Sequence, residues 1–147
     1  MKKVIYFLLF ISIIPTLIEA QVTPAPFTEE EARQFINEYK ERFVRRDLDA
    51  YMALFSREAA ENRMLPYADI QMAYQRTIAL SQSIQYQVKI YSIQTDAQSA
   101  FVHGRYEILQ TFKKGGKARV MKGDIQWVLV WEDGSLKIRE INYGRDR

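Results

Sequence analysis

The sequence predicts an α+β fold in which three N-terminal helices pack on one face of a four-stranded antiparallel sheet. Apolar residues recur at a spacing near four up to about residue 83, as in helices with one buried face. From residue 84 onward apolar and polar residues alternate, as in strands with one buried face. All of the helices therefore precede all of the strands, which is the order of an α+β fold.

The first predicted helix begins after Thr28 and ends near Arg46. Thr28 and Glu31 match a capping box, in which each side chain binds a free amide of the other residue's backbone. Helical spacing gives this segment one apolar face, formed by Ala32, Phe35, Ile36, Tyr39 and Phe43.

Two shorter helices are predicted next. Asp47 is suited to the N-cap of the second helix and Asp49 to its first turn, so we interpret both acids as structural. Pro66 can occupy the first turn of the third helix, which we expect to end near Ser83. Residues 56–65 have a weaker pattern and are expected to hold a turn and a short strand.

Four strands are predicted after residue 83. Alternation marks the first strand at residues 84–90 and the second at 100–108. The sequence Lys-Gly-Gly-Lys at 114–117 is a hairpin signal, and a third strand follows at about 118–132. A second hairpin signal, Asp133–Gly134, leads into the last strand.

The last strand, expected at residues 136–143, has an irregular pattern. Ile138 and Ile141 fall on opposite parities, so a regular strand would expose one of them. A β-bulge near Glu140 is predicted, because one extra residue would bring both isoleucines to a common face.

Residues 1–20 have the plan of a secretory signal peptide. Lys2 and Lys3 precede an apolar run, and Ala20 suits the last position before a cleavage site. The apolar run is short for a bilayer span, which needs about 20 residues. We therefore expect export to the periplasm or the medium, with retention as an uncleaved anchor as the alternative.

The rest of the chain is expected to form one folded unit. Residues 21–27 contain two prolines and no charge, and are predicted to be an extended lead-in. Residues 28–147 are the length of a single domain with its own core.

Composition excludes several classes of function. The formal net charge is +3 without a basic block, so nucleic acid is not an expected partner. The chain has no cysteine and one histidine, so disulfides, a cysteine-linked lipid anchor and a zinc site are not expected. We expect no metal or other cofactor, and no stable membrane insertion once the signal peptide is removed.

Two groups of residues form recognisable motifs. The segment Arg46-Asp47-Leu48-Asp49 is followed by Ala53-Leu54-Phe55, and Gly123, Trp127 and Leu129 are followed by Asp133–Gly134. The first group resembles the turn and small helix that follow the first helix in the NTF2-like superfamily, also called SnoaL-like, and the second resembles the last hairpin of that family. The likeness covers residues 28–143.

The resemblance implies an exported bacterial member with a cystatin-type α+β cone, in which a curved sheet wraps the first helix. A pocket is then expected at the open end of the cone. This fold hosts enzymes and binding modules alike, so it predicts function poorly. The residues expected to line the pocket are Tyr39, Arg63, Tyr74, Tyr86, Tyr106 and Trp127.

The isomerase-like branch of the superfamily supplies a test for catalysis. Tyr39 stands where that branch has its oxyanion-binding tyrosine, but the base position holds Arg63. An arginine stays protonated near neutral pH and cannot act as a base. Glu61 is the alternative base, and it is expected to share one side of a strand with Arg63, where the two could pair.

The strand around Trp127 is apolar on both faces, which indicates that both faces are covered. The helices can cover one face. We expect a second copy to cover the other in a homodimer, with an interface formed by Phe101, Leu109, Val128 and Val130. His103 is predicted to point outward on the same face.

These observations favour a non-catalytic exported module that binds a small apolar or aromatic ligand or a cell-envelope protein. The alternative is a small isomerase, cyclase or dehydratase with Tyr39 as proton donor and Glu61 as base. A third reading is a structural subunit whose pocket is filled by its own side chains.

Overall fold

The computed structural model describes residues 26–146. The predicted signal peptide at 1–20 and most of the lead-in at 21–27 lie outside the described residues. The helices are α1 (Glu29–Arg45), α2 (Leu48–Met52) and α3 (Tyr67–Leu80), and the strands are β1 (Phe55–Glu61), β2 (Leu65–Pro66), β3 (Ser81–Thr95), β4 (Ser99–Phe112), β5 (Ala118–Glu132) and β6 (Ser135–Tyr143). Within residues 26–146 no helix has the length and apolar character needed to cross a membrane.

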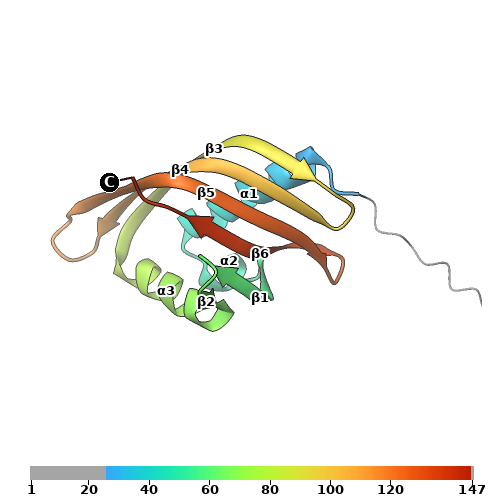
Figure 1. Ribbon diagram of the computed structural model, residues 1–147. Coiled ribbons are helices and arrows are strands. Elements are labelled where there is room, and N and C mark those ends of the chain that lie inside the picture. Colours follow the sequence, from blue (N-terminus) through green and yellow to red (C-terminus); the bar gives the residue numbers. More distant parts are fainter. Residues whose placement is uncertain (1–25, 147) are drawn as a thin grey trace, which may run out of the picture.

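The six strands form one curved sheet in the order β2-β1-β6-β5-β4-β3 (Figure 1). The prediction of an α+β fold with three helices is confirmed, but the four-stranded antiparallel sheet is a wrong prediction. β1 pairs in parallel with β6, and the two-residue β2 pairs with β1. The sequence FSREAAE of β1 lacks regular alternation, and its partner lies at the far end of the chain, so no hairpin signal marks the pairing.

The helix ends follow the capping pattern of the sequence. The Thr28 side chain accepts a hydrogen bond from the Glu31 amide, and the Glu31 side chain binds back to the Thr28 amide. Arg46 ends α1 in the left-handed conformation, with φ of 60°. Asp47 then caps α2 by accepting a hydrogen bond from the Ala50 amide. The predicted caps of α1 and α2 are confirmed.

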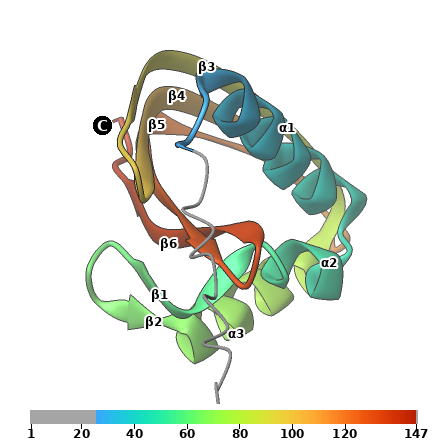
Figure 2. The ribbon, with the colours of Figure 1, turned by 90° about the vertical axis from the view of Figure 1, so that its right-hand side faces the viewer.

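The helices cover the concave face of the sheet (Figure 2). α1 packs against β3, and α3 packs against β1. The core between these layers includes Tyr39 and Ile36 from α1 and Trp127 and Leu129 from β5, all of which are buried. The curvature leaves a space between α1, α3 and the sheet, and this space contains the candidate site.

The β-bulge predicted in the last strand is confirmed. Glu140 pairs with Val128 while Ile138 pairs with Leu129, so Arg139 is the extra residue. Ile138 and Ile141 are both completely buried as a result. The bulge therefore lets one strand supply two core isoleucines that regular alternation would separate.

The convex face of the sheet carries no helix. Phe101 lies opposite Val128 at one end of this face, and Leu109 lies opposite Val120 at the other. His103 is exposed between them, as predicted. The remaining pairs between the two apolar ends are Arg105 with Asp124 and Glu107 with Lys122.

Candidate functional site

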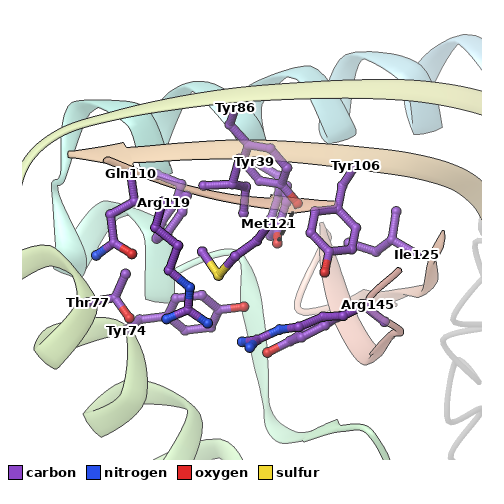
Figure 3. Close-up of a pocket in the computed structure, with 13 residues that line it drawn as sticks. Tyr39, Tyr74, Thr77, Tyr86, Tyr106, Gln110, Arg119, Met121, Ile125 and Arg145 are labelled. Carbon is purple, nitrogen blue, oxygen red and sulfur yellow. Dashed lines mark hydrogen bonds between the residues drawn. The ribbon is translucent and has the colours of Figure 1, made fainter. Parts of the chain in front are cut away.

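A cavity of about 150 Å³ lies between the concave face of the sheet and helices α1 and α3. Its volume is on the order of that needed for one benzene ring. Strands β3 to β6 and the tail after β6 supply the rest of its wall. The lining residues are Tyr39, Phe43, Tyr74, Thr77, Tyr86, Tyr106, Ile108, Gln110, Arg119, Met121, Ile125, Tyr143 and Arg145 (Figure 3).

Aromatic rings form the helical side of the cavity. The Tyr39 ring packs edge-on against Tyr86 at 5.9 Å and against Trp127 at 5.7 Å between ring centroids. Phe43 packs edge-on against Tyr74 at 5.5 Å. Edge-to-face contacts of this kind add to the stabilisation from burial and fix the ring orientations. The hydroxyl groups on these rings are therefore held in place before any ligand binds.

Four tyrosine hydroxyls lie close together, those of Tyr39, Tyr74 and Tyr86 on the cavity wall and that of Tyr51 from α2, whose ring packs against Tyr39 and Tyr74. Tyr86 donates a hydrogen bond to Tyr39 at 3.4 Å, and the Tyr51 hydroxyl has no hydrogen-bond partner within the described residues. Burial raises the pKa of all four well above 10, and the charge of Glu61 adds to the rise for Tyr74. All four hydroxyls therefore stay protonated near neutral pH.

Glu61, at the end of β1, is a buried carboxylate beside the cavity. Its side chain is 3% exposed, and Oε1 accepts a hydrogen bond of 2.5 Å from the hydroxyl of Tyr143 on the cavity wall. Burial and this hydrogen bond raise the pKa of Tyr143. Oε2 has no hydrogen-bond partner among residues 26–146. A buried carboxylate oxygen without a partner is costly, so its presence needs an explanation.

The pairing of Glu61 with Arg63 considered from the sequence does not form. β1 ends at Glu61, and the chain then reverses through Asn62 and Arg63, which have φ angles of 49° and 60°. Arg63 is exposed on this turn, whereas Glu61 points inward to Tyr143. Alternation along a strand therefore does not apply to these two residues, because the strand has already ended.

Two arginines stand at the mouth of the cavity. Arg119 comes from the start of β5 and Arg145 from the tail after β6, and both are exposed. Neither forms an ion pair with any residue between 26 and 146. Figure 3 shows both guanidinium groups pointing toward the part of the cavity that holds the Tyr74 hydroxyl. The mouth is therefore positively charged.

The tail that carries Arg145 is held against β5. The Gly144 amide donates a hydrogen bond to the Asp124 carbonyl, and its own carbonyl accepts one from the Tyr106 hydroxyl at 2.9 Å. Asp146 forms an ion pair with Arg105. A Cβ atom at Gly123 would lie 2.1 Å from the Gly144 oxygen, so the tail can approach this closely only because residue 123 is glycine.

Four of the six residues predicted for the pocket lie on the cavity wall, and two lie elsewhere. Tyr39, Tyr74, Tyr86 and Tyr106 line the cavity. Arg63 lies on the exposed turn, and Trp127 is completely buried behind Tyr39 because α1 covers that face of β5. Whether any of the six residues contacts a ligand stays a prediction.

Sequence reasoning missed Arg119, Tyr143 and Arg145. Tyr143 shares the parity of the buried Ile141 in β6, which was a usable signal for a side chain that faces inward. Arg119 and Arg145 have no local signal, because their positions depend on how two distant segments meet. Within the described part of the chain, no group of three histidine, cysteine, aspartate or glutamate side chains could hold a metal ion.

Several solved structures share this fold. A nuclear transport factor 2 (NTF2-like) superfamily protein from Salmonella enterica superposes with a TM-score of 0.70 at 16% identity, over 80% of this chain and 90% of that one. A protein from Novosphingobium aromaticivorans, named as a candidate aromatic ring hydroxylase, gives 0.71 at 12% identity, over 80% of this chain and 88% of that one. A candidate dehydratase from the NTF2-like family, from Streptomyces avermitilis, superposes with a TM-score of 0.69 at 12% identity, over 80% of this chain and 95% of that one.

The chain has the NTF2-like fold that its motifs resemble. Identities this low show the fold and leave the activity open. No protein-family profile matches the chain, and no curated protein matches it.

The tyrosine cluster predicts a loss of stability at alkaline pH. Folding raises the pKa of Tyr39, Tyr51, Tyr74 and Tyr86, so their stabilisation is complete below the ordinary tyrosine pKa and is lost as pH rises above it. Above about pH 10 each tyrosine should lower the unfolding free energy by about 1.4 kcal/mol per pH unit. Urea unfolding between pH 8 and 11, with tyrosinate absorbance as a second signal, measures this slope. A Tyr86→Phe variant should have a shallower slope, and equal slopes in both proteins would contradict the prediction.

Proposed function

We propose that the protein is a non-catalytic binding module for a small single-ring acid, and that the cavity between α1, α3 and the sheet is its binding site. The observation that carries the proposal is a ring-sized cavity with aromatic walls and, at its mouth, two arginines that form no ion pair among residues 26–146. The cavity is open, which counts against the reading in which the chain fills its own pocket.

The dimensions of the cavity limit the ligand. A volume of about 150 Å³ lies below the roughly 300 Å³ at which pockets for drug-sized molecules begin. One planar ring therefore fits inside, and any further group must extend through the mouth. Aromatic rings in the wall favour an aromatic or other flat ring through edge-to-face contacts.

The charge at the mouth favours an acid. Arg119 and Arg145 form no ion pair among residues 26–146, and arginine binds carboxylates through two parallel hydrogen bonds. A carboxylate attached to the buried ring would extend through the mouth and reach the guanidinium groups of Arg119 and Arg145. Because both arginines are exposed, the attraction should weaken with salt.

Substitution of the two arginines tests the proposed ligand class. We expect benzoate to bind. Arg119→Gln or Arg145→Gln should raise its Kd by about threefold to tenfold, since exposed charge pairs contribute modestly to the binding free energy. Isothermal titration calorimetry at two salt concentrations measures the effect. Arg76→Gln, which changes an exposed arginine of α3 outside the cavity, is the matched control.

Benzamide provides the second control, because it keeps the ring and lacks the charge. Its affinity should be the same in the wild type and in both arginine variants. Equal losses for benzoate and benzamide would show that the variants disturb the cavity itself. No binding of either compound would overturn the proposed function.

A second function, proton transfer, is favoured by the position of Glu61. Its carboxylate is buried and binds the hydroxyl of Tyr143, which lines the cavity together with Tyr39. A proton leaving a ligand carbon next to a carbonyl could pass to the Tyr143 oxygen while the tyrosine proton passes to Glu61. The resulting enolate oxygen would lie near the positively charged mouth.

Proton exchange at carbon tests the second function. In this case the wild-type protein should speed the exchange of the α-hydrogens of cyclohexanone in D₂O by about 100-fold or more over a Glu61→Gln variant. Proton NMR follows the loss of the α-hydrogen signal. If the wild type exchanges these hydrogens no faster than the variant, Glu61 does not act as a base, and the binding module is favoured.

We also propose that the convex face of the sheet pairs with a second copy of this chain. Apolar residues lie at both ends of the face, at Phe101 with Val128 and Val130, and at Leu109. The stretch between them carries both signs of charge in cross-strand pairs. A two-fold axis brings the same patch of each copy together, so a patch with both signs can pair with itself.

Sedimentation velocity tests the dimer. The wild type should sediment as a dimer, and Phe101→Asp should shift it to a monomer because a buried unpaired charge is costly. Met72→Asp, which changes an exposed apolar residue of α3, should leave the dimer intact. A dimer that survives Phe101→Asp would place the interface on another surface.

Export through residues 1–20 and a cell-envelope protein partner both stay predictions. The segment lies outside residues 26–146, and a binding module in the cell envelope would meet small acids from the medium. This location is part of the proposal and follows from the signal-peptide pattern alone.

A further inference from the structure

The hydroxyl of Tyr143 can only accept hydrogen bonds from a molecule in the cavity. A tyrosine hydroxyl has one proton to donate, together with lone pairs that accept. The proton of Tyr143 is directed to Oε1 of Glu61, at 2.5 Å between the oxygens. The side of the oxygen that faces the cavity therefore presents lone pairs alone.

Tyr106 is arranged in the same way. Its hydroxyl donates to the carbonyl of Gly144 at 2.9 Å, and its ring packs edge-on against that of Tyr143 at 5.9 Å. Two neighbouring hydroxyls of the wall thus have their protons bound to protein oxygens. This part of the cavity accepts hydrogen bonds, whereas the mouth at Arg119 and Arg145 only donates them.

The hydrogen bond from Tyr143 explains why a glutamate is buried at position 61. The carboxylate is 3% exposed, and its Oε2 has no partner in the described part of the chain, which makes it a costly residue for stability alone. Its one hydrogen bond to a side chain is the bond from Tyr143. A carboxylate can accept but cannot donate, so it leaves this tyrosine a single orientation.

We propose that Glu61 is a specificity-determining residue that orients the hydroxyl of Tyr143, so that the cavity selects a single-ring acid with a hydroxyl group on the ring. The ring hydroxyl donates to the Tyr143 oxygen, and the carboxylate binds Arg119 and Arg145. Glu61 acts through Tyr143 and does not touch the ligand. This inference rests on the proposed function, which requires the ring and the acid only.

Paired ligands test the inference. The 3- and 4-hydroxybenzoates are compared with 3- and 4-fluorobenzoate, because fluorine has nearly the size of a hydroxyl group and no proton to donate. Calorimetry on the full-length wild-type protein should give one hydroxybenzoate a Kd about tenfold or more below that of its fluorine counterpart, since the fluorine analogue leaves the buried acceptor on Tyr143 without a hydrogen bond.

Two variants locate the source of this preference. Glu61→Gln keeps the shape but can donate to Tyr143 as well as accept from it, so the preference should fall to about threefold or less. Tyr143→Phe should abolish it. Glu58→Gln, an exposed glutamate of the same strand, should keep the wild-type preference. Thermal unfolding of each variant checks that the fold is retained.

The outcomes separate this inference from the proposed function. Binding of benzoate without any preference for the hydroxybenzoates, or a preference that survives Glu61→Gln, would overturn the inference and leave the proposed function standing. If none of the acids binds, the proposed function fails, and the ligand class named here fails with it.

A second measurement needs no ligand. A hydrogen bond as short as that between Tyr143 and Glu61 should give a proton NMR signal far downfield of the amide region in the wild type. The signal should disappear in Tyr143→Phe and move upfield in Glu61→Gln. Its absence from the wild-type spectrum would show that Glu61 does not orient Tyr143, whatever the binding data give.

Discussion

The candidate site depends on the parallel pairing of β1 with β6. This pairing places Glu61 opposite Ile141, two residues before Tyr143 on the same strand. Asn62 joins the two segments, because its amide donates to the Ile141 carbonyl at 2.9 Å and its Oδ1 accepts from the Tyr143 amide at 2.8 Å. Without this contact Glu61 would end a surface strand, and Tyr143 would lie on an uncovered sheet edge.

Local features of the fold could be predicted from the sequence, and the long-range ones could not. The caps at Thr28 and Asp47 and the bulge before Glu140 follow from side-chain chemistry and spacing within a few residues. The parallel pair of β1 and β6 has no such signal, since no hairpin turn joins its strands. The expected placement of Glu61 and Arg63 on one side of a strand fails because β1 ends at Glu61 and the chain turns at Asn62 and Arg63.

The cavity was predictable in part for the same reason. The tyrosines of α1, α3, β3 and β4 fall on apolar faces whose spacing shows which way they point. Arg145 belongs to a tail with no repeating pattern, and its position depends on the missing side chain of Gly123 and on an ion pair between Asp146 and Arg105. Contacts of this kind join strands β4 and β5 to the end of the chain and appear only once the sheet is assembled.

The tail also links the two faces of the sheet. Arg105 lies on the convex face opposite Asp124, and the same side chain holds Asp146, next to Arg145 at the mouth of the cavity. A contact on the convex face that drew Arg105 away from Asp146 would remove one of the contacts that hold the tail, beside the backbone hydrogen bonds of Gly144 and Asp146 to β5. Binding free energies at the two faces would then be coupled, and such coupling is reciprocal. If the position of Arg145 shifts with that of Arg105, the affinity for an acid depends on what covers the opposite side of the sheet.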